Sequence, residues 1–478
     1  MNVSRRTFLS SLVGSSIPGL LHRAEAAGNK RNVVLILVDD LGWRDFACTG
    51  HPYHETPHID ALAREGMQFT QAYSACPVCS PTRAALLTGK YPARLQLTDW
   101  IPGRRQWPAA KLITPSFAQQ LPLTEVTIAE ILNSQGYRTA SIGKWHLGEE
   151  GFGPEQQGFD RNIAGTSKGS PPGYFGPFDL PRLQGGSKED LLTDALTSEA
   201  MKFLEEAKSE PFFLYLPHFT VHTPIQAPVP LVEKYQKKIE FMGLSGNATY
   251  AAMVETLDNS VGRLRQKLQE LGLQGNTVFL LTSDNGGLRF EGKAKDPVTN
   301  NAPTRSGKGH LYEGGIRVPL LAAGPGIANG KNRTPVTSVD LLPTICEITG
   351  IATPKKLDGV SIASLFSNNK PIPPRPLYWH YPHYSNQGGT PGGAVRDGDW
   401  KLIEFYEDGR LELFNLSRDP GEQQNLVVRH GDIAKKMKQQ LNKWRKSAKA
   451  AMPSPNPAYS ATGADQGLTG VEPPTPVI

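Results

Sequence analysis

Cysteine is scarce in this sequence, with four residues in a chain of 478. A scaffold held together by disulfides needs many more, so that class of fold is excluded. A strong charge of one sign is also lacking, because 51 basic residues stand against 45 acidic ones and the net charge is +6. This excess is too small and too scattered to predict a nucleic-acid partner, although it suits an anionic substrate.

Long apolar runs are missing as well, since no segment reaches the ~18 apolar residues of a membrane-spanning helix. The composition still supports a sizeable core, with 38% hydrophobic and 20% charged residues. The length suggests two or three units, or one large domain with an appendage. We therefore expect a folded protein without a transmembrane segment.

The first 26 residues have the features of an export signal. Arg5 and Arg6 precede a mildly apolar stretch that is broken by Pro18, and residues 24–26 form a small-x-small cleavage site. Paired arginines followed by Phe-Leu are typical of the twin-arginine pathway. We expect residues 1–26 to be a twin-arginine-type signal peptide and the mature protein to be exported, periplasmic or secreted. The alternative is a slightly basic, disordered N-terminus.

Apolar runs that end in polar residues alternate with helical patterns along the chain. The predicted strands cover residues 33–38, 138–142, 212–216 and 277–281, and the predicted helices cover residues 127–134, 190–207 and 250–271. An uninterrupted run such as 33–38 favours a strand buried on both faces of a parallel sheet. The alternation predicts an α/β fold, with a large mostly parallel sheet sandwiched by helices.

Ligands bind beyond the carboxyl ends of the strands in such sheets, so polar residues at these ends are candidates for a site. These residues are Asp39, Asp40, Lys144, His146, His222, Asp284 and Asn285. Turn propensity explains one polar strand end easily, but it explains four of them poorly. The acidic and amide side chains offer oxygen ligands, which suit Ca²⁺ or Mg²⁺ and suit zinc poorly. The cations Arg83, Lys144 and Lys308 then indicate a substrate with compact negative charge, a sulfate or a phosphate.

The pair Cys76 and Cys79 forms a C-x-x-C motif, which alone would indicate a redox dithiol or half of a zinc site. Both interpretations are weak, because the chain has no second such pair and Cys48 and Cys346 lack metal-ligand spacing. The residues from Cys79 onward indicate a different function. They read Cys79-Ser80-Pro81-Thr82-Arg83, and Leu87-Thr88-Gly89 comes shortly after.

This segment resembles the first signature of the type I, formylglycine-dependent sulfatases of the alkaline phosphatase superfamily. Residues 136–148, which contain Gly143-Lys144-Trp145-His146, resemble the second signature. Further matches lie at Asp39-Asp40, residues 56–60, residues 283–286, residues 308–319, residues 340–344 and residues 419–426. The resemblance spans about residues 32–430 and implies a sulfuric ester hydrolase.

The resemblance also implies a cofactor chemistry. Cys79 would be oxidised to formylglycine (3-oxoalanine) by a separate formylglycine-generating enzyme, and its hydrated aldehyde would be the nucleophile. A sulfated thiol offers no easy route for the release of sulfate, whereas a sulfated gem-diol can expel sulfate by returning to the aldehyde. Ca²⁺, with Mg²⁺ as the alternative, would be held by Asp39, Asp40, Cys79 in its modified form, Asp284 and Asn285.

The remaining residues of the two signatures receive roles by the same resemblance. Arg83 and Lys144 would orient the diol, and His146 would be the base that triggers its collapse. His222 and Lys308 would neutralise or protonate the departing oxygen. Of the other nearby histidines, His218 and His310 are expected to have structural or solvated positions.

The C-terminal part has a different pattern. Short strands at 393–399, 400–406 and 411–415 predict antiparallel hairpins, and a basic amphipathic helix follows at 433–448. Packing of this helix on the small sheet is favoured over a membrane-surface role. The expected units are the signal at 1–26, a sulfatase catalytic domain at 27–370, a C-terminal subdomain at 371–450 and a Pro-rich tail at 451–478.

The substrate is less well defined by the sequence. A sulfated poly- or oligosaccharide is preferred, and a small aryl sulfate is the alternative. Arg104, Arg105, His380 and His383 lie in loops that could contact it, and their roles stay open. Two other functions are considered: a phosphonate or phosphodiester hydrolase of the same superfamily, and a non-catalytic binder of sulfated glycans with an unconverted Cys79.

Overall fold

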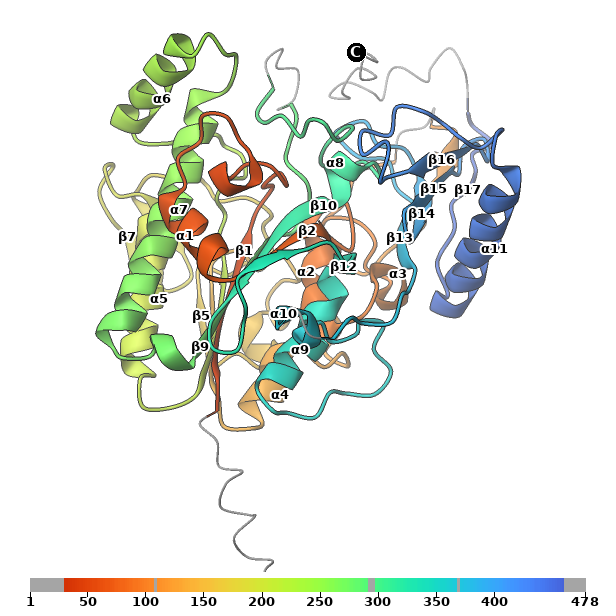
Figure 1. Ribbon diagram of the computed structural model, residues 1–478. Coiled ribbons are helices and arrows are strands. Elements are labelled where there is room, and N and C mark those ends of the chain that lie inside the picture. Colours follow the sequence, from red (N-terminus) through yellow and green to blue (C-terminus); the bar gives the residue numbers. More distant parts are fainter. Residues whose placement is uncertain (1–29, 107–109, 291–296, 368–369, 460–478) are drawn as a thin grey trace, which may run out of the picture. The chain divides into compact units, whose positions relative to one another are not determined.

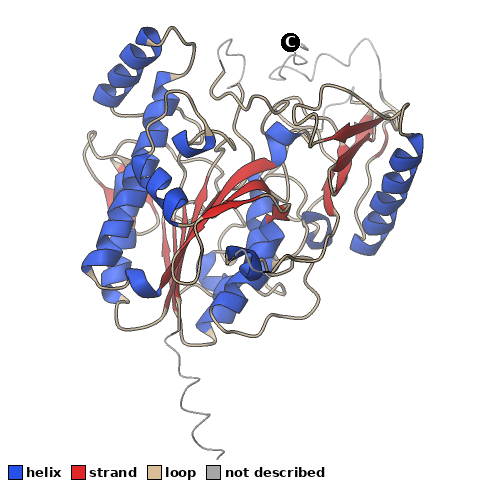
Figure 2. Ribbon diagram, viewed as in Figure 1, coloured by secondary structure: helices blue, strands red, loops and turns tan. Residues whose placement is uncertain are grey.

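The computed structural model describes residues 30–106, 110–290, 297–367 and 370–459. The predicted signal peptide and the end of the predicted tail lie outside these ranges. A nine-stranded sheet runs through the centre of the described chain (Figures 1 and 2). Its strands are β1 (Asn32–Val38), β2 (Met67–Tyr73), β4 (Arg138–Ile142), β5 (Arg161–Ile163), β8 (Phe212–Pro217), β9 (Thr277–Ser283), β10 (Arg317–Ala323), β11 (Gly330–Asn332) and β12 (Val336–Thr337).

The strand order is β11-β2-β10-β9-β1-β8-β4-β5, with β12 paired to β2. All pairs are parallel except those of β10, which is antiparallel to both β2 and β9. The predicted mostly parallel sheet is therefore confirmed. The four predicted strands are β1, β4, β8 and β9, and they are neighbours in the order β9-β1-β8-β4.

Helices cover both faces of this sheet because the strands are apolar on both sides. Val34 on β1 belongs to a core with helices α1 (Pro57–Glu65), α5 (Leu192–Glu206), α6 (Val229–Phe241) and α7 (Ala248–Glu270). Leu35, the next residue, points into the opposite core with α2 (Cys79–Thr88), α4 (Ile128–Asn133), α9 (Leu341–Ile348) and α10 (Ala363–Phe366). The alternation of strand side chains thus separates two cores.

The C-terminal part forms a second sheet, in the order β13 (Leu377–Tyr381), β14 (Gly392–Asp397), β15 (Trp400–Phe405) and β16 (Leu411–Asn415). All its pairs are antiparallel, as predicted. Helix α11 (Gly431–Ala448) buries Met437, Leu441 and Trp444 against one face of this sheet. The packing interpretation of this helix is confirmed, and none of the described helices is long and apolar enough to cross a membrane.

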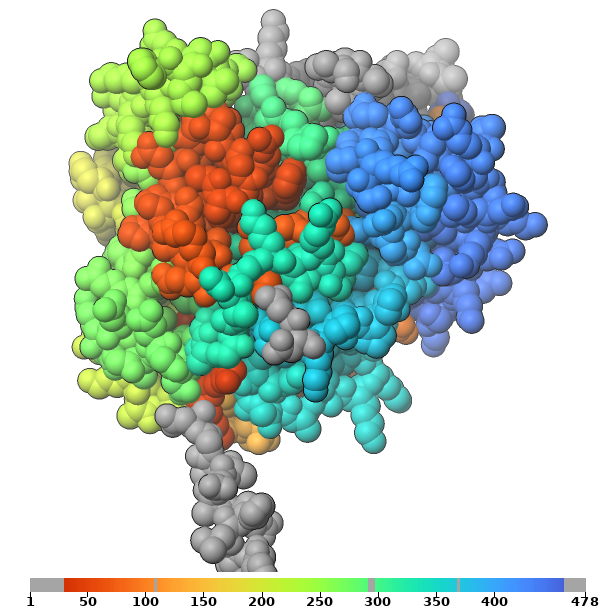
Figure 3. Space-filling view, viewed as in Figure 1, coloured from red at the N-terminus to blue at the C-terminus, as the bar shows by residue number. Residues whose placement is uncertain are grey.

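The other face of the small sheet packs against the chain that leads to Cys79. Trp379 on β13 shares a core with Tyr73 and Val78, and its Nε1 donates a hydrogen bond to the Ser74 carbonyl at 2.8 Å. Figure 3 shows the C-terminal residues, in blue, directly against the residues coloured green to cyan. The small sheet therefore supports the segment that carries the predicted nucleophile.

The remaining described elements are short. They are α3 (Pro92–Leu95), α8 (Glu313–Ile316), β3 (Leu112–Ile113), β6 (Phe178–Leu180), β7 (Leu183–Gly185) and β17 (Ser454–Pro455), with 3-10 turns at Ala47–Thr49, Pro154–Gln157, Gln274–Asn276 and Ser338–Asp340. Strand β17 pairs with β3 in antiparallel fashion, so the start of the predicted tail is held by backbone hydrogen bonds.

A buried ion cluster ties the small sheet to the large one. Lys401 on β15 is fully buried, and its Nζ lies 3.0 Å from Glu313 Oε1 and 2.8 Å from Glu422 Oε1. Glu313 also accepts a hydrogen bond from the Tyr73 hydroxyl at 2.7 Å, at the end of β2. Because two buried carboxylates share one ammonium group, loss of that group leaves Glu422 without its ion pair and leaves Glu313 with the more distant Arg317, at 4.0 Å.

Lys401→Met should therefore lower the free energy of unfolding by about 3–5 kcal/mol, measured by urea denaturation. The control is Lys202→Met, which removes a lysine that is 65% exposed and paired with Glu199 at 2.6 Å. That change should cost no more than about 1 kcal/mol. Equal losses in the two variants would contradict the structural role given to Lys401.

Candidate active site

Two predicted acidic residues follow β1 directly and are buried at its carboxyl end. Val38, the last residue of β1, pairs with Ser283 on the parallel neighbour β9, so Asp39 and Asp284 emerge side by side. The Asp40 backbone adopts φ 58°, a left-handed conformation that aspartate tolerates better than most residues. Its N–H donates to Asp284 Oδ1 at 3.2 Å. The sheet register thus brings three carboxylates together.

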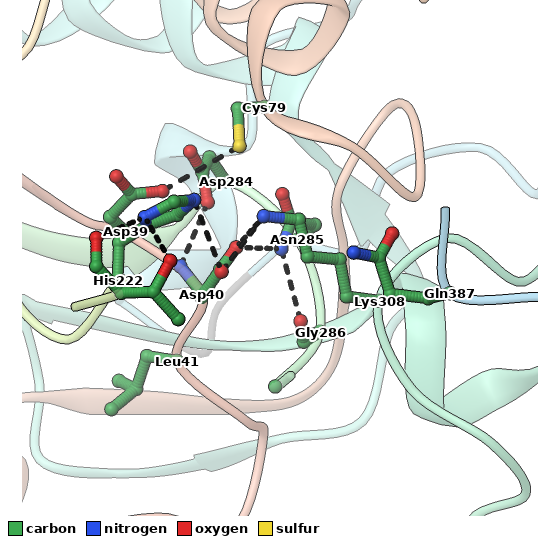
Figure 4. Close-up of polar contacts among 12 residues, drawn as sticks. Asp39, Asp40, Leu41, Cys79, His222, Asp284, Asn285, Gly286, Lys308 and Gln387 are labelled. Atoms are coloured by element: carbon green, nitrogen blue, oxygen red, sulfur yellow. Dashed lines mark hydrogen bonds and ion pairs between the residues drawn. The ribbon is translucent and has the colours of Figure 1, made fainter. Parts of the chain in front are cut away.

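Three cations from other segments compensate these carboxylates, and Figure 4 shows part of the arrangement. The ion pairs join Lys144 to Asp39 at 2.7 Å, Arg83 to Asp284 at 2.7 Å and Lys308 to Asp40 at 2.8 Å. No side chain among the six is more than 9% exposed. Charges buried this deeply require partners, so the cluster forms one interdependent unit.

The compensation is uneven across the cluster. Burial and the charge of Asp284 raise the pKa of Asp39 to about 8, against the opposing effects of Lys144 and Arg83. Burial would also raise the pKa of Asp40, but Lys308 and His222 hold it below its ordinary value. Asp39 is therefore the carboxylate with the least compensation, and further positive charge beside it would be favourable.

The donor set fits a hard divalent cation. Asn285 donates from Nδ2 to Asp40 Oδ1 at 2.7 Å, while its buried Oδ1 has no hydrogen-bond partner among the described residues. A buried oxygen without a donor is rare and indicates a missing ligand or ion. Together with Asp39 and Asp284 it offers the oxygen-rich environment that Ca²⁺ or Mg²⁺ prefers. The structure thus brings the predicted metal residues into one cluster, although metal binding itself stays a prediction.

Cys79 begins helix α2 beside this cluster. Its Sγ lies 3.6 Å from Asp39 Oδ1, and the ligand atoms of Asp39, Asp40, Cys79 and His222 all lie within 4.8 Å of one another. Burial raises the pKa of the Cys79 thiol to about 12. The thiol is therefore neutral near pH 7 and is a weak nucleophile as it stands.

His146 has the hydrogen bonding expected of a base. Its Nε2 lies 2.6 Å from the Ile101 carbonyl and so carries the ring proton, while the buried Nδ1 has no partner within the described residues. Burial and the charge of Lys144 hold the pKa of His146 well below its ordinary value. The Ile101 N–H donates to Ser80 Oγ at 3.1 Å, so one loop connects the base to the residue after Cys79.

The other histidines differ in their contacts. His222 Nε2 lies 3.6 Å from Asp40 Oδ2, and burial with the charge of Lys308 lowers the pKa of His222 to about 3. His218 instead contacts Ser260 on α7 through Nε2 at 3.1 Å. His222 lines the active-site cavity, whereas His218 and His310 do not.

The cluster forms the floor of a cavity of about 510 Å³. Its lining residues include Asp40, Cys79, Trp100, Ile101, Pro102, His146, Lys168, Gly169, His222, Lys308, Asn386 and Gln387. The aromatic Trp100 lies in the loop that also carries Arg104 and Arg105. Lys168, Asn386 and Gln387 were missed, because isolated polar residues in Gly-rich loops give no periodic or motif signal.

The cavity lining does not include the four residues whose roles the sequence left open, which are Arg104, Arg105, His380 and His383. His380 contacts the Tyr406 hydroxyl at 2.8 Å, and His383 contacts Thr98 Oγ1 at 2.8 Å. Arg104 donates to the Ser385 carbonyl at 3.0 Å. Arg105 is exposed. His383 and Arg104 hold the loop after residue 98 against the loop after β13, and these two loops together form one side of the cavity. His380 lies on β13 itself and holds that strand to Tyr406 and to the Ala451 carbonyl.

A second group of potential ligands lies on the loop after Asp40. It consists of Asp45, His51 and His54. The Asp45 carboxylate already accepts hydrogen bonds from Tyr250 at 2.6 Å and Thr299 at 2.7 Å, and the two imidazole rings stack with centroids 3.3 Å apart. His51 Nδ1 accepts a hydrogen bond from the His54 N–H at 3.2 Å, and His54 Nδ1 contacts the Asp45 carbonyl at 2.8 Å. This group therefore stabilises the loop that follows Asp40.

The parallel sheet, the buried acidic cluster and the cysteine at the start of α2 define a hydrolase of the sulfatase type. Residues 31–351 match the family model described as Sulfatase, and residues 306–447 match the one described as N-sulphoglucosamine sulphohydrolase, C-terminal. The chain belongs to the sulfatase family, as its resemblance to that family predicted, and it is an enzyme that hydrolyses sulfate esters.

Relatives of established name align over most of their length. The chain is 33% identical to a sulfatase of Formosa agariphila, over 87% of this chain and 89% of that protein. It is 33% identical to human arylsulfatase A, over 84% of each, and 34% identical to the mouse N-acetylgalactosamine-6-sulfatase, over 86% and 79%. Among solved structures, Ps i-CgsB is 29% identical with a TM-score of 0.74, covering 92% of this chain and 98% of that one.

Gly169→Ala should lower kcat on a sulfate ester by about 10- to 100-fold, because sub-ångström displacement of a reacting group is costly. A Cβ on Gly169 would lie 2.6 Å from His146 Cε1, so the ring would have to move. Gly275→Ala is the control, because a Cβ there meets no atom within 4 Å. Unchanged kcat in the Gly169 variant would show that the position of the His146 ring does not limit turnover.

Proposed function

We propose that this sulfatase removes sulfate from a sulfated poly- or oligosaccharide, with formylglycine at position 79 as nucleophile and Ca²⁺ as cofactor. The observation that supports the proposal is the position of Cys79, at the start of α2 beside Asp39 and on the floor of the cavity. Because burial keeps the thiol neutral, an unmodified cysteine would be poorly suited to attack a sulfate ester.

Asp39, Asp40, Asp284, Asn285 and the modified residue 79 would hold the metal. Ca²⁺ would polarise a sulfate oxygen as a Lewis acid. Mg²⁺ is the alternative, because it also prefers oxygen ligands. Arg83 and Lys144 contact the carboxylates directly, so their first effect is to keep the cluster intact. Beyond that, we assign them the orientation of the diol that the family resemblance implies.

The chemistry supplied by formylglycine is a hydroxyl nucleophile on a carbon that can return to the aldehyde and so release sulfate. His146 has the free Nδ1 that can accept the proton in that return. Lys308 and His222 both lie at Asp40 and line the cavity, where they would stabilise the charge of the departing oxygen. The proposed base, His146, therefore lies on a different segment from His222 and Lys308, which would contact the departing oxygen.

A carbohydrate is favoured as substrate by the cavity lining. Trp100 is partly exposed and offers an aromatic face, and Asn386 and Gln387 offer amide groups for hydroxyls. The structural relative Ps i-CgsB has been solved in complex with k-i-k-neocarrahexaose. For a chain exported by residues 1–26, an external polysaccharide is a consistent substrate. We also propose the domain limits 27–370 and 371–450 stated above.

Cys79→Ala should abolish sulfate release while leaving the thermal unfolding transition in place, because a small residue replaces a small one at a helix start. The peptide containing position 79, isolated from the native host, should carry an aldehyde in place of the thiol by mass spectrometry. A fully active protein with only thiol at this position would refute the formylglycine assignment. Faster cleavage of phosphodiesters than of sulfate monoesters would instead favour the phosphodiesterase alternative.

Ca²⁺ added to chelator-treated protein should raise its melting temperature, since a ligand at 100 times its Kd stabilises the folded state by about 2.7 kcal/mol. Asn285→Ala removes the buried Oδ1 that lacks a partner, so this variant should gain less from Ca²⁺. Asn259→Ala changes an exposed asparagine on α7 and should keep the full response. An equal response in all three proteins would place the ion elsewhere.

A further inference from the structure

One side of the active-site cavity comes from the C-terminal part of the chain, through the loop between β13 and β14. Ser385 organises this loop: its N–H donates to the Gly389 carbonyl at 2.8 Å, and its Oγ accepts from the Gln387 N–H at 3.0 Å. The same Oγ donates to Gln387 Oε1 at 2.8 Å. Both the backbone and the side chain of Gln387 are therefore fixed by one hydroxyl.

This loop lies against the backbone next to Lys308. A Cβ on Gly309 would come within 2.0 Å of Ser385 Oγ and 3.2 Å of Gln387 Oε1, and Gly309 has φ +84°. Only glycine allows both the left-handed backbone and this close approach. Figure 4 shows Gln387 beside Lys308, with its amide nitrogen toward the side where the other site residues lie. Lys308 and Gln387 both line the cavity.

The amide nitrogen of Gln387 is the group left for a ligand. Its Oε1 is taken by Ser385, and within the described residues no hydrogen bond from Nε2 to protein is formed. An amide NH₂ is a donor only, so its partner must be an acceptor oxygen. Sugars carry hydroxyl and ether oxygens on the carbons next to a sulfate ester, whereas a simple aryl sulfate has none there.

We propose that Gln387 determines specificity by donating a hydrogen bond to a sugar oxygen next to the scissile sulfate ester. The inference rests on the proposed function, which it deepens by assigning carbohydrate recognition to a residue of the C-terminal sheet's loop. Lys308, tied to Asp40 at 2.8 Å, sits at the sulfate end of the cavity. Gln387, which lies beside Lys308, then contacts the sugar atoms on the other side of the ester oxygen.

The test compares two substrate types on one variant. Gln387→Met keeps the length of the side chain and removes the donor. Its kcat/KM should fall about tenfold on the best substrate among galactose 6-sulfate, galactose 4-sulfate and N-acetylgalactosamine 6-sulfate, as expected for the loss of one neutral hydrogen bond. On 4-nitrophenyl sulfate it should stay within about twofold of the unaltered enzyme. Gln424→Met, the same change at an exposed position, should leave both values unchanged.

A double-mutant cycle tests whether Ser385 acts through Gln387. Ser385→Ala removes the hydroxyl that fixes the amide, so it should reduce kcat/KM on the sugar sulfate by about threefold and leave 4-nitrophenyl sulfate hydrolysis unchanged. Added to Gln387→Met, it should cause no further loss. Additive effects, or equal losses on both substrate types, would show a general structural role and overturn the proposal.

The possible failures can be told apart. Sugar-sulfate hydrolysis that is lost in Cys79→Ala but unaffected by Gln387→Met would overturn this inference and leave the proposed function standing. Hydrolysis of 4-nitrophenyl sulfate with no hydrolysis of any of the three sugar sulfates would overturn the carbohydrate assignment together with the role of Gln387.

Discussion

The pairing of three buried carboxylates with three buried cations is the constraint on which this site depends. The parallel register of β1 and β9 forces Asp39 and Asp284 together, and like charges at such short range would repel each other without compensation. The compensating groups come from α2, from the loop after β4 and from the segment before α8. Each of these segments must be held in place for the cluster to exist.

The small C-terminal sheet holds several of these segments. Trp379 contacts Ser74 just before the nucleophile, and Tyr381 donates to Asp99 at 2.9 Å in the loop that anchors His146. Lys401 binds Glu313 at the start of α8, shortly after Lys308. The C-terminal part is thus an element of the active site rather than an appendage, and the loop with Gln387 gives it a place in substrate recognition.

Burial also determines the protonation of the proposed nucleophile and base. It keeps the Cys79 thiol and the His146 imidazole uncharged, and it leaves His146 with one free ring nitrogen. A neutral thiol in this position supports a nucleophile that is made by modification and does not depend on thiolate formation. The same burial makes unpaired charge costly, so the cations that compensate Asp39, Asp40 and Asp284 cannot be replaced independently.

Strong local patterns made much of the fold predictable. The uninterrupted apolar runs of β1, β4, β8 and β9 identified the central strands, and the apolar stripe of α7 identified its helix. β2 and β10 were not predicted, because Gln68 and Gln71 interrupt the first and Pro319 lies within the second. Antiparallel β10 depends on its neighbours for its pairing, which no local pattern reports.

For the site, the sequence by itself identified the candidate residues, because they stand in short motifs at strand and helix ends. Tertiary structure alone decided how they are paired: Lys308 reaches Asp40 across 268 positions of the chain. Tertiary structure also determined which residues line the cavity, because the close approach of Ser385 to Gly309 fixes the position of Gln387. Local sequence encodes strands, caps and turns, whereas contacts between distant segments depend on packing that exists only once the chain has folded.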